Sequence, residues 1–180
     1  LRLDAVHALV DDSPRHLLQQ LSDETAELSQ ELGRPLGLVA ESDLNDPRTV
    51  EPVSKGGMGM TAQWSDDFHH AVHAAITGER QGYYSDFGSL AALAKTYTRV
   101  FFHDGIWSAF RHRTHGRQVD VFRVPAHRFL GYLQDHDQVG NRATGDRIAA
   151  TLSPELVKVG AGLVLTSPFT PMLFMGEEWG

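Results

Sequence analysis

Residues 36–41 read Leu36-Gly37-Leu38-Val39-Ala40-Glu41, a short apolar run that ends on a carboxylate. A run of this length and apolar content is typical of a strand buried on both faces. Other short runs have the same character, and we predict strands over residues 1–6, 60–64, 129–134 and 171–175. Each of these runs is followed by polar residues, so the predicted strands are short and clearly bounded.

Amphipathic segments separate the predicted strands. Ser13 and Pro14 have the residue types of an N-cap and a first helical position, and Gly33 is typical of a helix end. Further helices are predicted over residues 66–77 and 90–102 and from residue 154 onward, with a loop over 43–60 and an irregular excursion over 103–127. Strands that alternate with helices predict an α/β fold with a parallel sheet.

Composition narrows the classes of function. The chain has 180 residues, a formal net charge of −7 and no cysteine. The acidic balance argues against nucleic acid or an anionic membrane as a partner, and the longest apolar stretch is too short to span a bilayer. Without cysteine there is no disulfide, thiolate zinc site or thiol nucleophile, which is compatible with a reducing compartment.

The two ends of the sequence resemble the interior of a longer domain. Residues 1–6 read as a strand that is already under way, and residues 171–175 form another strand close to the end. We therefore expect residues 1–180 to be one partial domain, truncated at the N-terminus and also at the C-terminus. A (β/α)₈ barrel reduced to about its strands four to eight, with their helices, fits this pattern.

Residues that can carry chemistry follow the predicted strands. Asp4, Glu41, Trp64 and Asp137 each lie at or just beyond the carboxyl end of a strand. Both a (β/α)₈ barrel and a doubly wound sheet place their sites at that edge. No glycine-rich phosphate turn follows any strand, so a nucleotide site is disfavoured, and no cofactor is expected.

Asp4, Glu41 and Asp137 have the chemistry of a glycosidase. Two carboxylates on opposite sides of a sugar can act as nucleophile and as general acid, and the acid needs a raised pKa. Arg2 lies on the same face as Asp4 and can hold that carboxylate ionised, as a nucleophile requires. The plainer interpretation is that aspartates after strands are caps and turn formers.

Three segments resemble the α-amylase superfamily of glycoside hydrolases. Residues 2–7 (RLDAVH) resemble its nucleophile segment on the fourth strand, residues 39–41 (VAE) its acid/base segment on the fifth, and residues 132–137 (YLQDHD) its Asn-His-Asp segment on the seventh. Order and placement both match. The resemblance implies a retaining mechanism with Asp4 as nucleophile, Glu41 as acid/base and Asp137 as the third carboxylate.

Longer strings are similar to one family of that superfamily, the malto-oligosyltrehalose trehalohydrolases. They are AESDLNDP at 40–47, QWSDDFHH at 63–70, GERQGYY at 78–84, HDQVGNR at 136–142 and LFMGEE at 173–178. This resemblance covers nearly all 180 residues. It implies hydrolysis of the α-1,4 bond beside the terminal trehalose of a malto-oligosaccharide, with release of trehalose. It also implies a role in trehalose biosynthesis, a cytoplasmic location and a functional link to a trehalose-forming synthase.

The same resemblance implies a set of substrate-binding residues. They are Arg2, His7, Trp64, Asp66, Asp67, His69, His70, His136, Gln138 and Asn141. His69 and His73 also have a spacing that can ligate zinc on a helix, but the glutamate of a His-Glu-x-x-His motif is missing, so no metal site is predicted. Trp64 has an equally simple alternative as a core residue at a strand end.

Two departures from the superfamily pattern concern the site. Asp135 stands where the family has asparagine, and its extra charge can disturb titration or hydroxyl binding nearby. The superfamily's Asp-x-x-x-x-Asn-His segment on the third strand is absent, as expected for a piece that starts at the fourth strand.

Two rival functions remain open from the sequence. A glycogen branching enzyme or another transglycosylase of the superfamily shares the three carboxylates and differs in passing the sugar to a hydroxyl instead of water. The other rival is a sugar-binding or inactive fragment, since a chain that lacks barrel strands can fail to turn over substrate.

Overall fold

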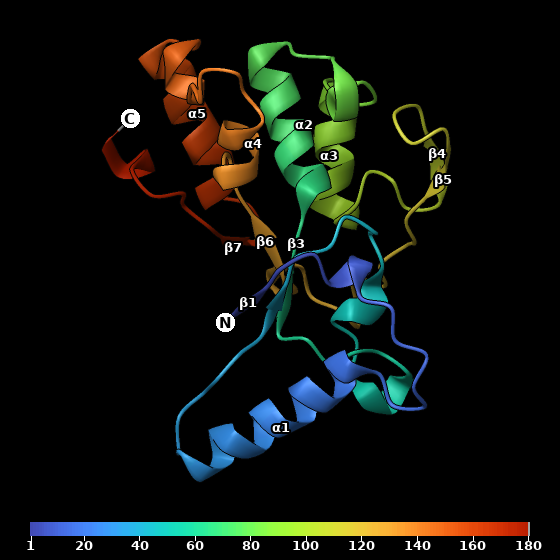
Figure 1. The fold of residues 1–180 in the computed structure, drawn as a ribbon. Helices are drawn as coiled ribbons and strands as arrows, with labels where there is room; N and C mark the ends of the chain where they lie inside the picture. The colour runs from blue at the N-terminus through green and yellow to red at the C-terminus, as the bar shows by residue number, and fades with distance from the viewer. Residues whose placement is uncertain (180) are drawn as a thin grey trace.

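A parallel sheet of five short strands organises the chain, and the computed structural model describes residues 1–179. The strands are β1 (Arg2–Leu3), β2 (Val39–Ala40), β3 (Ala62–Trp64), β6 (Phe129–Gly131) and β7 (Thr170–Pro171). They lie side by side in the order β1-β2-β3-β6-β7, and every neighbouring pair is parallel. Figure 1 labels β1, β3, β6 and β7 near the centre of the molecule. Because all strands run the same way, their carboxyl ends meet at one edge of the sheet.

Helices follow the strands as the alternating pattern predicts. The α-helices are α1 (Leu17–Glu31), α2 (Asp66–Thr77), α3 (Leu90–Arg99), α4 (His136–Gly140) and α5 (Pro154–Leu165). Single turns of 3₁₀-helix lie at Val6–Ala8, Pro47–Thr49, Val53–Lys55, Gly82–Tyr84, Ala126–Arg128, Ile148–Ala150 and Glu177–Trp179. The remaining strands, β4 (Ile106–Ser108) and β5 (Arg113–His115), form an antiparallel hairpin. The α/β prediction is confirmed.

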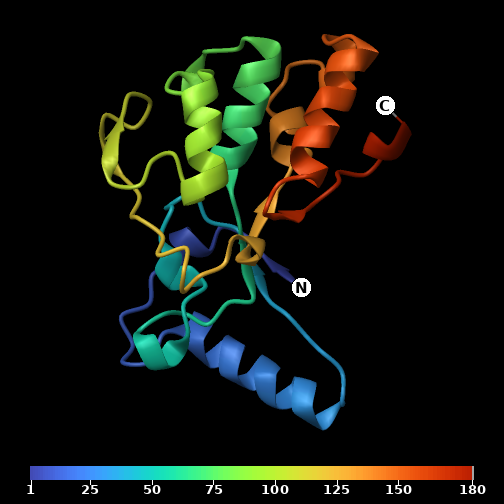
Figure 2. The ribbon, with the colours of Figure 1, turned by 180° about the vertical axis from the view of Figure 1, so that it is seen from behind.

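The helices are unevenly distributed about the sheet. In both views α2, α3, α4 and α5 lie together on one side of the molecule, while α1 lies apart from them (Figures 1 and 2). None of the helices in residues 1–179 has the length and apolar character needed to span a bilayer.

Aromatic side chains on α2 and the central strands form the centre of the core. Phe68 is fully buried, and its ring centroid lies 4.6 Å from that of Phe169 and 5.4 Å from that of Tyr97. Gly131 on β6 lets this ring approach the sheet, because a Cβ there would come within 2.9 Å of Phe68 Cε1. Phe68 therefore holds α2 against the strands that carry the polar residues described below.

Several predicted boundaries differ from the structure. Helix α1 begins at Leu17, not at Ser13, because the His16 ring nitrogen accepts the Leu18 amide while Asp11 binds Ser13 in a separate turn. The segment 103–127, predicted as irregular, contains the β4–β5 hairpin. The last strand, predicted over 171–175, ends at Pro171, beyond which only the Met172 amide bonds to the sheet.

We predict that Phe68→Ala lowers the free energy of unfolding by about 3–5 kcal/mol, because it leaves a large cavity between α2 and the sheet. Urea denaturation followed by circular dichroism measures this loss. Phe122→Ala is the matched control, since Phe122 is 99% exposed and its removal should change stability little. Equal effects of the two substitutions would contradict the assignment of Phe68 to the core.

Candidate active site

Arg2 joins two carboxylates that follow neighbouring strands. Its Nη2 atom donates hydrogen bonds to Asp4 Oδ1 at 2.8 Å and to Glu41 Oε2 at 2.5 Å. The backbone amide of Ala5 donates another to Glu41 Oε2 at 3.1 Å. Ala5 has a φ of 42°, a left-handed conformation that is uncommon for residues with a side chain, and this turn directs its amide at Glu41. Both carboxylates are therefore held in fixed orientations.

The shared nitrogen also limits the distance between the two carboxylates. Bonds of 2.8 and 2.5 Å to one atom hold Asp4 Oδ1 and Glu41 Oε2 within about 5–5.5 Å, the separation of a retaining pair. An inverting pair needs about 6.5–9.5 Å, to leave room for a water molecule. The geometry suits a covalent intermediate on one carboxylate and proton transfer by the other.

The two carboxyl groups have opposite shifts in pKa. The hydrogen bond with Glu41 and then the positive charge of Arg2 lower the pKa of Asp4. Burial raises the pKa of Glu41, and its hydrogen bond with Asp4 raises it further. The Asp4 side chain is 77% exposed and that of Glu41 is 19% exposed, which accounts for the difference in desolvation. Asp4 is therefore the ionised member and Glu41 the better proton donor.

A cavity of about 240 Å³ lies beside Glu41, beyond the carboxyl edge of the sheet. Its lining residues are Glu41, Asp43, Trp64, Asp66, His70, Tyr83, Phe110, Arg111, Asp135, Asp137, Gln138 and Asn141. Asp137 lies near enough for its charge to raise the pKa of Glu41. The structure thus gathers residues that follow β2, β3 and β6 around one space.

Four other predicted residues lie beside this cavity without lining it: Arg2, Asp4, His7 and His136. Arg2 lies 4.5 Å from the centroid of the Trp64 ring, beside the Asp4 and Glu41 carboxylates. His136 Nε2 is 3.5 Å from Asp137 Oδ1, and His7 Nε2 is 3.8 Å from Asp43 Oδ1. Both histidines are partly exposed.

Asp67 and His69, also predicted to bind substrate, do not line the cavity. Asp67 is buried and accepts hydrogen bonds from Asn45 Nδ2 at 2.8 Å and from the His103 amide at 2.7 Å. His69 has no exposed surface, stacks on Tyr132 and bonds through Nε2 to the Tyr84 hydroxyl at 3.1 Å. Both residues follow strand β3 in sequence, but the helical turn of α2 directs them into the interior instead of the cavity.

Asp66 is the α2 residue that reaches the cavity with a carboxyl group. Burial raises its pKa to about 7, although the Tyr132 hydroxyl donates to its Oδ1 at 2.5 Å. Asp66 is therefore protonated in part of the molecules at neutral pH and can donate or accept a hydrogen bond toward a ligand.

His70 presents a neutral imidazole to the same cavity. Burial lowers its pKa to about 3, and its ring stacks on Tyr83 with centroids 4.8 Å apart. Its Nδ1 is buried and has no partner among the described residues. Nearby, His73 Nε2 bonds to Glu79, so the His69–His73 pair is used within the protein. Among residues 1–179 no three His, Cys, Asp or Glu side chains gather in a way that could hold a metal ion.

The cavity wall also contains residues that were not among the predicted site residues. Arg111 and Phe110 come from the turn of the β4–β5 hairpin, and Arg111 Nη2 donates to Asp43 Oδ2 at 2.9 Å. Tyr83 comes from the turn after α2. Asp43 lies within the string at 40–47 and Tyr83 within the string at 78–84, and these two strings were the available signals. The hairpin residues had none, since their segment has no regular pattern.

Asp135, the departure from the family pattern, is the N-cap of α4. Its carboxylate accepts from the amides of Asp137 and Gln138, while Gln138 Oε1 accepts the Asp135 amide, which completes a capping box. Asparagine can cap a helix in the same way. Burial raises the pKa of Asp135, and the neighbouring charge of Asp137 raises it further.

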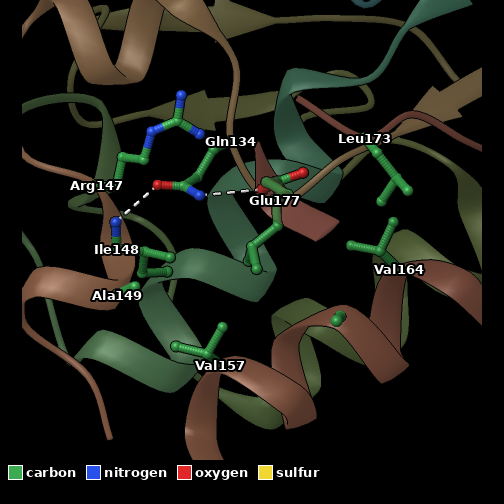
Figure 3. Close-up of a pocket in the computed structure, with 10 residues that line it drawn as sticks. Gln134, Arg147, Ile148, Ala149, Val157, Val164, Leu173 and Glu177 are labelled. Carbon is green, nitrogen blue, oxygen red and sulfur yellow. Dashed lines mark hydrogen bonds between the residues drawn. The ribbon is translucent and has the colours of Figure 1, made fainter. Parts of the chain in front are cut away.

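A second cavity, of about 50 Å³, lies between β6 and α5 and is mainly apolar (Figure 3). Its polar side chains bond to one another across it: Gln134 Oε1 accepts the Ile148 amide at 2.7 Å, and Gln134 Nε2 donates to Glu177 at 3.0 Å. These bonds join the segments after β6 and β7. The space is small and mainly apolar, so the cavity beside Glu41, which gathers several carboxylates, is the candidate site.

Comparison with known proteins gives one consistent result. The chain is 58% identical over 180 residues to malto-oligosyltrehalose trehalohydrolases of Mycobacterium tuberculosis and Arthrobacter ramosus, and 50% identical over 179 residues to that of Saccharolobus solfataricus. It covers 30–31% of these relatives' own lengths. No protein-family model matches it.

A solved structure supports the fold. A protein from Salmonella typhimurium, described as a candidate alpha amylase, superposes with a TM-score of 0.86 at 37% sequence identity. The match covers 99% of this chain and 30% of that protein. The chain is therefore similar over its whole length to one segment of larger α-amylase-like proteins.

We predict that Asp4→Asn lowers the pKa of Glu41, because it removes the neighbouring carboxylate that favours the protonated form. Asp137→Asn should lower it less, since Asp137 acts only through its charge. Titration of ¹³C-labelled glutamate carboxyl groups by NMR measures both shifts. An unchanged Glu41 titration in Asp4→Asn would contradict the coupling between the two groups.

Proposed function

We propose that this chain is the segment of a malto-oligosyltrehalose trehalohydrolase that contains its three catalytic carboxylates. The observation that carries the proposal is the Arg2 guanidinium shared by Asp4 and Glu41, within the separation of a retaining pair and with opposite pKa shifts. High identity to trehalohydrolases over the whole chain favours this activity among those of α-amylase-like proteins. The activity belongs to the longer protein, of which this chain spans about 30%.

The sheet corresponds in this proposal to strands four to eight of a (β/α)₈ barrel. Five parallel strands joined by helices form one contiguous part of such a barrel, and a barrel places its site at the edge where Asp4, Glu41 and Asp137 lie. Residues 1–180 would then be one part of a single catalytic domain.

The proposed reaction is a double displacement. Asp4 attacks the anomeric carbon and forms a glycosyl ester while Glu41 gives its proton to the departing trehalose oxygen. The ionised Glu41 then takes a proton from water as that water attacks the same carbon, which releases Asp4 and restores the acid. The raised pKa of Glu41 suits the first step, and the lowered pKa of Asp4 keeps the nucleophile ionised.

Other groups around the cavity would bind the sugar rings. Asp137 and His136 offer an acceptor and a donor for ring hydroxyls, and Trp64 offers an aromatic face. Asp66, His70, Gln138 and Asn141 supply further polar groups to the same cavity. In this proposal the substrate comes from an enzyme that forms the terminal trehalose, and both enzymes act in the cytoplasm.

Product analysis tests the proposal in the full-length protein that contains this segment. Incubation with malto-oligosyltrehalose should release free trehalose and the shortened malto-oligosaccharide, resolved by anion-exchange chromatography. Branched glucan would indicate a transglycosylase instead. Binding without turnover would indicate a sugar-binding protein, and either result would reject the hydrolase assignment.

We predict different effects of the two central substitutions on different substrates. Asp4→Asn should abolish turnover of every substrate, because no glycosyl ester can form. Glu41→Gln should slow the cleavage of malto-oligosyltrehalose far more than that of an aryl glycoside, because the good leaving group of the aryl glycoside departs without protonation. Stopped-flow measurement of leaving-group release compares the two. Equal losses on both substrates would show that Glu41 is not the acid.

A further inference from the structure

A buried histidine lies between two carboxylates behind the wall of the candidate site. His103 is 1% exposed, its Nε2 bonds to Asp86 Oδ2 at 3.0 Å, and its Nδ1 lies 3.5 Å from Asp67 Oδ1. Nδ1 has no closer partner. A neutral imidazole has only one N–H group, so it would leave one of the two carboxylates facing a lone pair. The arrangement therefore favours a doubly protonated, cationic His103.

The charges around His103 agree with this state. Burial alone would lower its pKa, but the hydrogen bonding and charge of Asp67 and then of Asp86 outweigh burial and raise it. The other titratable rings nearby are His70 and His115, and burial lowers the pKa of both, so they are neutral. Lys95 is paired with Asp104, the residue that follows His103, through a contact of 2.6 Å between Nζ and Oδ1. The buried group thus consists of one cation and two anions.

This group connects to the hairpin that carries part of the cavity wall. Asp86 Oδ2 also accepts the amide of Ala109, the first residue of the β4–β5 turn, at 2.8 Å. The next two residues of that turn are Phe110 and Arg111, which line the cavity. The Phe110 ring lies 6.1 Å from that of Tyr83, another residue of the cavity wall, in an edge-to-face arrangement. Asp86 therefore holds the hairpin turn and His103 at the same oxygen.

The other side of the group holds the loop after β2. Asn45 Nδ2 donates to Asp67 Oδ2 at 2.8 Å and to the His103 carbonyl at 3.1 Å. Gly116 packs against that carbonyl so closely that a Cβ there would lie 1.8 Å from it. The loop, α2 and the hairpin thus meet at His103, although none of the residues Asp67, Asp86 and His103 lines the cavity.

We propose that His103 is a positioning residue, which with Asp67 and Asp86 fixes the β4–β5 hairpin so that Phe110 and Arg111 form part of the cavity wall. The role of this wall in substrate binding rests on the proposed function, but the positioning of the hairpin depends only on the contacts described above. Loss of the cation leaves two buried carboxylates facing each other, which favours release of the hairpin.

Hydrogen exchange tests the positioning without reference to activity. In the full-length protein, His103→Gln should increase deuterium uptake in residues 106–115. In the unsubstituted protein, the protection of these amides relative to their intrinsic exchange rate at each pH should fall as the pH increases through the raised pKa of His103. The sign follows because a group with a raised folded pKa stabilises the fold below that pKa and loses the effect above it. His127→Gln, on an exposed histidine, is the control and should change nothing there.

A second variant covers the case in which His103→Gln fails to fold. Asp86→Asn keeps an oxygen for the Ala109 amide, removes one charge, and affects a side chain that is 19% exposed. It should also increase exchange in the hairpin and shift the pH dependence to lower values. Unchanged exchange in Asp86→Asn, or in a folded His103→Gln, would overturn the proposal.

Kinetics separate this inference from the proposed function. His103→Gln should raise KM for malto-oligosyltrehalose about tenfold with a smaller effect on kcat, as expected for a lost binding contact. Combined with Phe110→Ala and Arg111→Ala, it should add no further loss, because it acts through those residues. If the losses in the combined variant equal the product of the separate losses, positioning through the hairpin is rejected. If the unsubstituted protein releases no trehalose, the proposed function fails, and hydrogen exchange still decides the role of His103.

Discussion

The parallel pairing of β1 with β2 is the constraint on which the site depends. Leu3 pairs with Ala40, so the next residue of each strand, Asp4 and Glu41, leaves the sheet at the same level. The Glu41 amide bonds to the Leu3 carbonyl at 2.9 Å, which fixes this register at the point where the strands end. A shift of one residue would turn one carboxylate to the opposite face, where Arg2 could not join the two.

A high density of acids beyond this edge sets the electrostatics of the site. Glu41, Asp66 and Asp135 each have a pKa raised first by burial, and neighbouring carboxylates raise all three further. Burial therefore favours the protonated form of these three carboxyl groups. Asp4 differs because its side chain is 77% exposed, and the hydrogen bond with Glu41 and then the charge of Arg2 lower its pKa. The division between a proton donor and an ionised nucleophile thus follows mainly from the burial of Glu41 and the exposure of Asp4, which Arg2 joins.

The sequence was most informative where a site residue comes directly after a predicted strand. Glu41 and Asp137 follow predicted strands, and both line the cavity. Side-chain direction within a helix was harder to predict: Asp66 and Asp67 are adjacent in sequence, yet one lines the cavity and the other is buried against His103. The contribution of Phe110 was not predictable, because it depends on tertiary contacts that place a hairpin without periodicity.

The exposure of Asp4 is understandable when the sheet is considered as part of a larger barrel. Asp4 follows β1, which is an edge strand here, and its side chain is 77% exposed. A nucleophile in a water-filled setting loses much of the electrostatic advantage of a preorganised site. In the proposed barrel another strand pairs with the open side of β1, covering Asp4 while leaving the Arg2 contacts intact. Desolvation would then strengthen the attraction between Arg2 and both carboxylates, so the contacts that orient Asp4 and Glu41 in this segment would hold them more firmly in the proposed barrel.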